Sequence, residues 1–244
     1  MSGHSHAKTI KHAKELTDKK KGQIFSKLSR IISVAAQEGG GNPETNSKLR
    51  MAIDEARSFN LPKDNIEKAI KRGTGELTGE NLEEVVFEGF GPGGVAIIIE
   101  GITDNKNRAL GEIKQILNQG GGKLGGEGSV RWMFDRKGCI IVNLKMQNED
   151  LKDKEKLELA AIETGAEDVF WRDEFLDIYT KPEDLEKVKS NLENKQIKID
   201  SASLGWVEKE TIEVGEKEKE SCQKLFEALD ENEAVQDIYS NLKL

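Results

Sequence analysis

Histidine is scarce in this chain of 244 residues, and all three copies, His4, His6 and His12, lie within the first 12 positions. A Ser-His-Asp triad or a histidine general base is therefore excluded from the rest of the chain. The two cysteines, Cys139 and Cys222, form no CxxC pair, which is typical of ordinary thiols in a reducing compartment. No apolar run approaches the ~18 residues of a membrane span, and no apolar signal segment opens the chain. We expect a cytoplasmic protein without membrane attachment or enzymatic activity.

Positive charge is concentrated at the start of the chain. Residues 1–75 contain 15 Lys and Arg against 8 Asp and Glu, whereas residues 76–244 contain 22 against 37, and the net charge is −8. A basic segment ahead of an acidic body is typical of proteins that contact nucleic acid. The alternative is a solvated lysine-rich tail without a partner, and charge alone does not separate the two.

Three short helices are predicted before residue 78. The first begins near residue 19 and ends at the run 39–41, and its apolar residues recur at helical spacing: Ile24, Phe25, Leu28, Ile31, Ile32 and Ala35. The same spacing places Lys27, Arg30 and Ser33 on the opposite, exposed face. Asn42-Pro43 is a candidate N-cap for the second helix, and the third begins near Pro62 and ends at 71–73.

The remaining residues alternate between strand and helix patterns. Residues 138–202 predict β-α-β-β-α-β, and residues 95–135 with 208–240 predict the same order, with strands at 129–135, 196–202 and 210–214 among them. The predicted fold class is therefore α+β, with two ferredoxin-like α/β domains, the third domain inserted in the second. The predicted boundaries are a three-helix domain at 1–78, a discontinuous domain at 79–136 and 205–244, and an insertion at 137–204.

Two glycine-rich segments are candidates for phosphate binding. Residues 89–94 match G-x-G-x-x-G, but a strand pattern follows where a dinucleotide site needs a helix, so a turn is expected. The loop 120–128 lacks the Gly-Lys-Ser/Thr of a P-loop, although its amides and Lys123 could cradle an anion. We expect no cofactor and no metal site.

The basic residues around the first helix are the predicted nucleic-acid-binding site. They match phosphate groups rather than base edges, because the helical segments offer no aromatic platform for stacking. The predicted site residues are Lys8, Lys11, His12, Lys14, Lys19, Lys20, Lys21, Lys27 and Arg30.

Several motifs along the chain resemble those of the YebC family. They are Ser2-Gly3-His4-Ser5, Ile10-Lys11-His12, residues 21–28 (KGQIFSKL), residues 61–66 (LPKDNI), residues 69–73 (AIKRG), residues 87–95 (FEGFGPGGV), residues 103–108 (TDNKNR), and residues 125–129 (GGEGS) with Met133-Phe134. The resemblance implies a three-helix domain followed by two α/β domains, and a bacterial type of protein that regulates transcription or assists translation. Where the family usually has Lys-Trp-Ala-Asn, this chain has His6-Ala7-Lys8-Thr9, and it has Ala13 where Arg is common.

Three functions follow as hypotheses. The preferred one is a DNA-binding transcriptional regulator, with duplex DNA as the partner. The alternative is a translation factor bound to ribosomal RNA or the ribosome, and a further alternative is a ligand-sensing module between paired ferredoxin-like units. No sequence feature fixes the oligomeric state, for which we expect a monomer.

Overall fold

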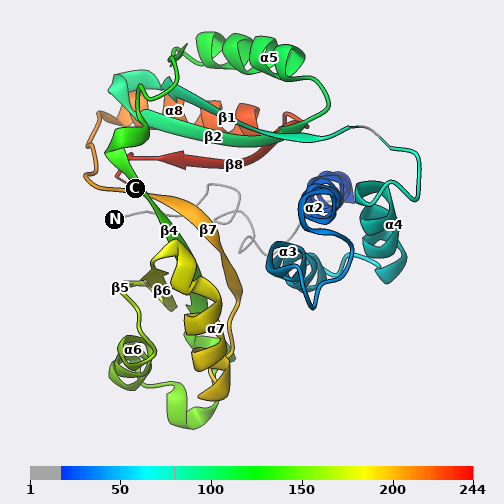
Figure 1. The fold of residues 1–244 in the computed structure, drawn as a ribbon. Coiled ribbons are helices and arrows are strands. Elements are labelled where there is room, and N and C mark those ends of the chain that lie inside the picture. The colour runs from blue at the N-terminus through cyan, green and yellow to red at the C-terminus, as the bar shows by residue number, and fades with distance from the viewer. Residues whose placement is uncertain (1–17, 80, 244) are drawn as a thin grey trace. The chain divides into compact units, whose positions relative to one another are not determined.

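The computed structural model describes residues 18–79 and 81–243, except for the side chains of Asp18, Lys19 and Asp150 (Figure 1). Two compact units are present. One comprises the described residues up to Asp135 together with those from Trp206 onward, and the other is Arg136–Gly205. No helix in the described ranges is long and apolar enough to cross a membrane.

Three helices open the first unit, as predicted: α2 (Asp18–Gly39), α3 (Ser47–Ser58) and α4 (Lys63–Gly73). α2 packs against both of the others. Apolar side chains three or four positions apart give each helix one apolar stripe, and the three stripes meet in a shared core. Its members include Leu28, Ile32, Ala35, Leu49, Ala52, Ile53, Ala56, Ile66 and Ala69.

Gly73 allows α4 to approach α2 closely. A Cβ atom at this position would lie 2.2 Å from the carbonyl oxygen of Ser33, so no larger residue fits without a shift of the backbone. The Ser33 hydroxyl donates to the Ala69 carbonyl at 2.8 Å across the same contact. The prediction that Ser33 is exposed is therefore wrong. Only 7% of Ser33 is exposed, because α4 covers α2 on that side.

The predicted N-cap of the second helix is also wrong. α3 begins at Ser47, and its cap is Asn46, whose side-chain oxygen accepts from the Leu49 amide at 3.0 Å. The Asn46 amide group also donates to the carbonyls of Ala35 and Gly40. Asn42 instead closes a turn by accepting from the Glu44 amide.

A four-stranded antiparallel sheet follows the bundle in the first unit. β1 (Glu83–Phe90) and β2 (Ala96–Thr103) form a hairpin around the short 3-10 helix η1 (Pro92–Gly94). The strand order is β3-β1-β2-β8, with β3 (Lys123–Leu124) on β1 and β8 (Val235–Ser240) on β2. The two-residue strand β3 lies inside the glycine-rich loop and was not predicted.

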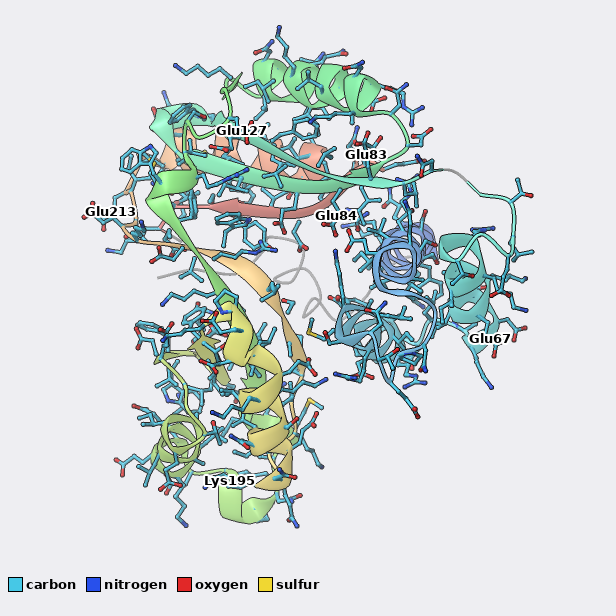
Figure 2. The ribbon with its side chains drawn as sticks, viewed as in Figure 1. Glu67, Glu83, Glu84, Glu127, Lys195 and Glu213 are labelled. Carbon is cyan, nitrogen blue, oxygen red and sulfur yellow. The ribbon has the colours of Figure 1, made fainter. Side chains whose placement is uncertain are left out.

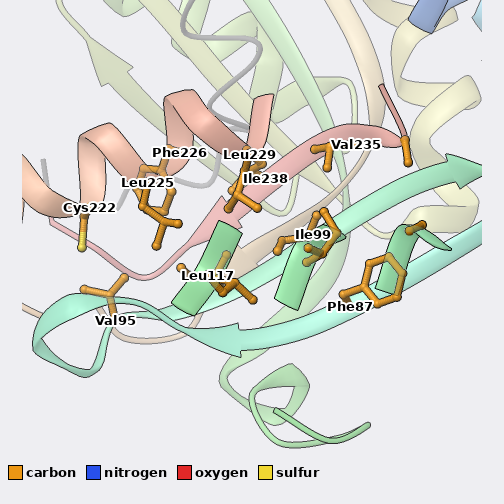
Figure 3. Close-up of a cluster of buried hydrophobic side chains, with 14 of the residues drawn as sticks. Phe87, Val95, Ile99, Leu117, Cys222, Leu225, Phe226, Leu229, Val235 and Ile238 are labelled. Atoms are coloured by element: carbon orange, nitrogen blue, oxygen red, sulfur yellow. The ribbon is translucent and has the colours of Figure 1, made fainter. Parts of the chain in front are cut away.

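Both faces of β2 are buried. Ile97 and Ile99 pack with α5 (Lys106–Gln119) and α8 (Glu216–Asp230) in the main core of this unit (Figure 3). Ala96 and Ile98 alternate with them and face a smaller cluster on the other side of the sheet, formed with Val130, Phe134 and Tyr239. This alternation follows from the period of two along a strand.

The expected strand at 129–135 does not form. Residues Arg131–Met133 are a 3-10 helix, η2, and β4 (Phe134–Asn143) begins after it. The Glu88 carboxylate accepts the amides of Val130 and Arg131, which are donors that a strand would give to its neighbour. In the sheet, β1 lies between β3 and β2.

The second unit is ferredoxin-like, as predicted. Its sheet has the order β5-β6-β4-β7, and its element order is β-α-β-β-α-β. After β4 come α6 (Lys154–Glu163), β5 (Asp168–Arg172), β6 (Phe175–Thr180), α7 (Leu185–Asn194) and β7 (Ser201–Glu208), with the 3-10 helices η3 (Leu144–Met146), η4 (Glu149–Leu151) and η5 (Pro182–Asp184).

Two predicted strands near the end of the chain differ from the structure. The strand expected at 196–202 begins at Ser201. The backbone amides of Gln196 and Ile197 instead donate hydrogen bonds to carbonyl groups at the end of α7. The strand expected at 210–214 contributes a single bridge, between Ile212 and Leu242. The helix 216–230 and the strand 235–240 agree with the prediction.

Candidate nucleic-acid interface

The predicted site residues fall into three groups. Lys8, Lys11, His12 and Lys14 lie outside the described residues. Lys19, Lys20 and Lys21 lie in the first turn of α2, where Lys20 and Lys21 are exposed and the side chain of Lys19 is not described. Lys27 and Arg30 lie further along the same helix. Three adjacent cations create a strong local attraction for anions.

Lys27 and Arg30 do not lie on an exposed face of α2, so that expectation is wrong. Nζ of Lys27 lies 2.7 Å from the carboxylate and 2.8 Å from the carbonyl oxygen of Asp230, and 13% of the Lys27 side chain is exposed. Arg30 donates to the carbonyl oxygen of Glu233 and to its carboxylate, the latter at 3.2 Å. Asp230 and Glu233 flank the turn between α8 and β8. They are 203 positions away in sequence, so helical spacing gave no sign of these contacts.

A cleft of about 530 Å³ lies along α2, α4 and the segment that follows α4. Arg30 and Arg72 contribute two guanidinium groups to its wall, and Phe25 contributes an aromatic ring. Ser26, Gln37 and Asn65 add hydroxyl and amide groups. No acidic side chain lines the cleft among the residues that the structure describes. Its charge and hydrogen-bonding groups therefore suit an anion such as a phosphate group.

Arg72 is the site residue that sequence reasoning missed. It is exposed and forms no ion pair with any described residue. The start of its side chain packs beside Gly79, where a Cβ atom would lie 3.4 Å from that of Arg72. In the sequence, Lys71-Arg72-Gly73 signals the end of a helix, and nothing in it indicates that the next segment folds back to form a cleft.

Acidic side chains dominate other parts of the first unit. Glu83 and Glu84 at the start of β1, Glu127 in the glycine-rich loop and Glu213 before α8 are all exposed (Figure 2). The uneven distribution of charge predicted from sequence thus persists on the described surface. A polyanion would be repelled by these carboxylates and attracted to the first turn of α2 and the cleft.

The glycine-rich loop does cradle an anion, but the anion is the protein's own. The buried Glu88 carboxylate accepts the amides of Gly128, Val130 and Arg131 at 2.8, 2.9 and 2.9 Å. Burial by itself would raise the pKa of Glu88, but these three donors and the Arg131 charge hold it below its ordinary value of 4.5. The amides of Gly128, Val130 and Arg131 are therefore already occupied by Glu88 rather than open to an external anion. Lys123 instead lies over the Phe90 ring, 5.4 Å from its centroid.

Both cysteines are buried thiols without a disulfide. Burial raises the pKa of Cys222, and the nearby Glu218 raises it further, so the thiol stays protonated at neutral pH. Within the described ranges, no three His, Cys, Asp or Glu side chains gather in a way that could hold a metal ion.

Comparison with known families accounts for nearly the whole chain. Residues 5–76 match the TACO1/YebC protein N-terminal domain, and residues 82–242 match the TACO1/YebC second and third domain. The chain belongs to the TACO1/YebC family. The resemblance seen in the motifs is thereby confirmed.

Relatives within the TACO1/YebC family are similar over their full length. A protein of Thermoanaerobacter pseudethanolicus is 49% identical, with 100% of this chain and 98% of that protein covered. One of Thermotoga maritima is 46% identical, with 100% and 94% covered. Both are named probable transcriptional regulatory proteins.

The fold is shared with a solved crystal structure. A conserved hypothetical protein from Aquifex aeolicus matches with a TM-score of 0.88 and 44% identity, covering 96% of this chain and 95% of that one. The α+β class of this TACO1/YebC chain, with N-terminal helices and two four-stranded antiparallel sheets, agrees with that structure.

Proposed function

We propose that this protein is a nucleic-acid-binding regulator of gene expression, and that it binds duplex DNA as a transcriptional regulator. The names of its relatives support this function. The observation that carries it is the cleft beside the lysines of α2, which is lined by Arg72 and by Arg30, the latter paired with Glu233. Ser26 in the cleft lies five residues after Lys21, about 7.5 Å along the helix axis and about 140° around it, so the proposed polyanion wraps partly around α2 to contact both.

The proposed contact is with the phosphate backbone. Lysine and arginine neutralise phosphates and release counterions, which gives affinity without reading the sequence. We propose that the lysines hold successive phosphates and that Arg72 holds one phosphate in the cleft, while Arg30 stays paired with Glu233. Lys8, Lys11, His12 and Lys14 are proposed to extend this surface, whereas Lys27 serves mainly to hold Asp230.

We also propose the domain boundaries of the chain, its compartment and its oligomeric state. We propose a binding domain at 1–78, a discontinuous α/β domain at 79–136 and 205–244, and an inserted domain at 137–204; the separate family matches to 5–76 and 82–242 support the first boundary. We propose a binding role without catalysis, in the cytoplasm and as a monomer. Cys139 and Cys222 are thiols rather than partners in a disulfide, which supports a reducing compartment.

A translation factor bound to the ribosome is the second candidate. Phosphate contacts do not distinguish DNA from structured RNA, so the surface described above serves either partner. The exposed side chain of Trp132 favours a partner with unpaired bases.

Substitution of Arg72 tests the proposed function. Arg72→Ala should weaken binding to labelled duplex DNA about 10-fold in fluorescence anisotropy at ~150 mM salt, because it removes a charge-assisted bond to phosphate. The matched control is Arg57→Ala, which removes the same charge from α3, where Arg57 pairs with Asp54. Co-sedimentation with ribosomes in the same salt decides between the two candidates.

Tight DNA binding without ribosome association supports a transcriptional regulator, and the reverse result makes the translation factor the function. If neither partner binds the wild-type chain, or if the two variants weaken binding equally, the proposal is wrong.

A further inference from the structure

Trp132 is the most exposed of the large apolar side chains in the described ranges. It is 65% exposed, whereas the next, Leu159, is 58% exposed and offers only an aliphatic surface. A tryptophan ring carries a large apolar area, and most of the free energy available from its burial is forgone here. The ring is also distant in sequence from α2 and the cleft, so the proposed phosphate contacts do not account for it.

The exposed ring is held in place. Trp132 is the middle residue of η2, and buried residues anchor the turn on both sides: Val130 is 0% and Phe134 is 3% exposed. The indole N–H donates to the Ser129 carbonyl at 3.2 Å, which fixes the orientation of the ring. The Glu88 carboxylate ties the preceding amides to β1. Trp132 is therefore presented outward on a firm support.

The neighbours of Trp132 carry positive charge. The Arg131 guanidinium lies over the Trp206 ring, 5.6 Å from its centroid, and 3.4 Å from the buried Glu88 carboxylate, with 39% of the Arg131 side chain exposed. Lys209 is 49% exposed and bonds through its amide to the Met133 carbonyl, with Asp135 as its ion-pair partner. In sequence, residues 121–137 contain four Lys and Arg against two acids, although residues from 76 onward contain 22 against 37.

We propose that Trp132 is a stacking platform for an unpaired nucleobase of the bound nucleic acid, with Arg131 beside the adjoining phosphate. A rigid aromatic ring flanked by cations is the arrangement that proteins use to hold single-stranded bases. Every base has a π-face, so such a platform tolerates any sequence. This inference rests on the proposed binding of nucleic acid and extends it: beside the part held through phosphates at α2, the bound nucleic acid has unpaired nucleotides, as structured RNA or locally opened DNA does.

The test compares a single-stranded 12-nucleotide RNA with a blunt 12-base-pair duplex of the same sequence. Trp132→Ala in the full chain should weaken binding of the single strand roughly 5- to 150-fold, because stacking contributes that range per base, and should change duplex binding less than twofold. Trp132→Phe keeps a ring and should lose less. Leu110→Ala is the matched control, since it removes another exposed apolar side chain from the same unit.

Melting temperatures establish that the variants are folded, and sedimentation shows whether Trp132 instead joins two copies of the chain. The inference is overturned if Trp132→Ala binds the single strand as the wild type does, if it weakens both probes equally, or if it dissociates a dimer. If the wild type binds neither probe and does not bind duplex DNA, the proposed function fails and this inference fails with it; if it binds duplex DNA but neither probe, this inference alone fails. Loss of binding in Lys19/Lys20/Lys21→Gln without loss in Trp132→Ala overturns this inference alone.

Discussion

At the scale of single residues, Glu88 joins β1 to the glycine-rich loop and to the turn that carries Trp132. It is 3% exposed, and its carboxylate receives three backbone amides from a loop about 40 positions away, with the Arg131 guanidinium 3.4 Å distant. A buried charge is tolerated only when it is paired and hydrogen-bonded, as this one is. Glu88 thereby fixes both the glycine-rich loop and the turn that presents Trp132.

Glu88→Gln should lower the free energy of unfolding by about 1–3 kcal/mol at pH 7, because charged acceptors are lost at a buried site. The folded-state pKa of Glu88 is depressed, so its stabilisation is present above the ordinary value of 4.5 and is lost as pH falls through the lower folded-state pKa. The difference between wild type and variant should therefore shrink below about pH 4.5. Urea unfolding across this range measures it, with the exposed Glu83→Gln as control. A constant difference at all pH values would contradict this account of Glu88.

At the scale of elements, the start of α3 depends on Asn46. Its side chain caps the helix and bonds to two carbonyls at the end of α2, so one buried residue joins two helix ends. Asn46→Ala should cost about 2 kcal/mol of stability, since it removes a cap and leaves buried carbonyls unpaired. Asn42→Ala, at the position that sequence favoured, should cost less than about 0.5 kcal/mol. Thermal unfolding of both variants checks this, and a larger loss for Asn42→Ala would show that the assignment of the cap is wrong.

Elements with a local cause could be predicted from sequence, and those with a distant cause could not. α8 and β8 agree with the prediction because their apolar periodicity and length are unambiguous. Val130, Trp132 and Phe134 alternate as in a strand, yet the Glu88 carboxylate takes the amides that a strand would use. Similarly, the Gln147 side chain bonds both the amide and the carbonyl of Lys198, ahead of β7, so the predicted strand starts late.

At the scale of the whole molecule, the candidate site could be predicted only in part. The basic segment could be located from the sequence, because the positions of Lys and Arg along the chain are enough to show it. It could not reveal that Lys27 and Arg30 meet Asp230 and Glu233, or that Arg72 lines a cleft, because these depend on contacts between distant parts of the chain. The described structure therefore narrows the proposed contact to the first turn of α2 and the cleft.

The proposed function places most phosphate contacts on the N-terminal helices and few on the acidic surfaces of α5 and α8. The most direct test is the salt dependence of duplex DNA binding for two variants with equal loss of charge: Lys19/Lys20/Lys21→Gln in α2, and Lys114/Lys217/Lys224→Gln on the exposed faces of α5 and α8. Each phosphate contact contributes about 0.9 to the slope of log K against log salt. We predict that the α2 variant binds more weakly, with a slope reduced by about 2–3, and that the other variant keeps the wild-type slope. Equal slopes for the two variants would contradict the account.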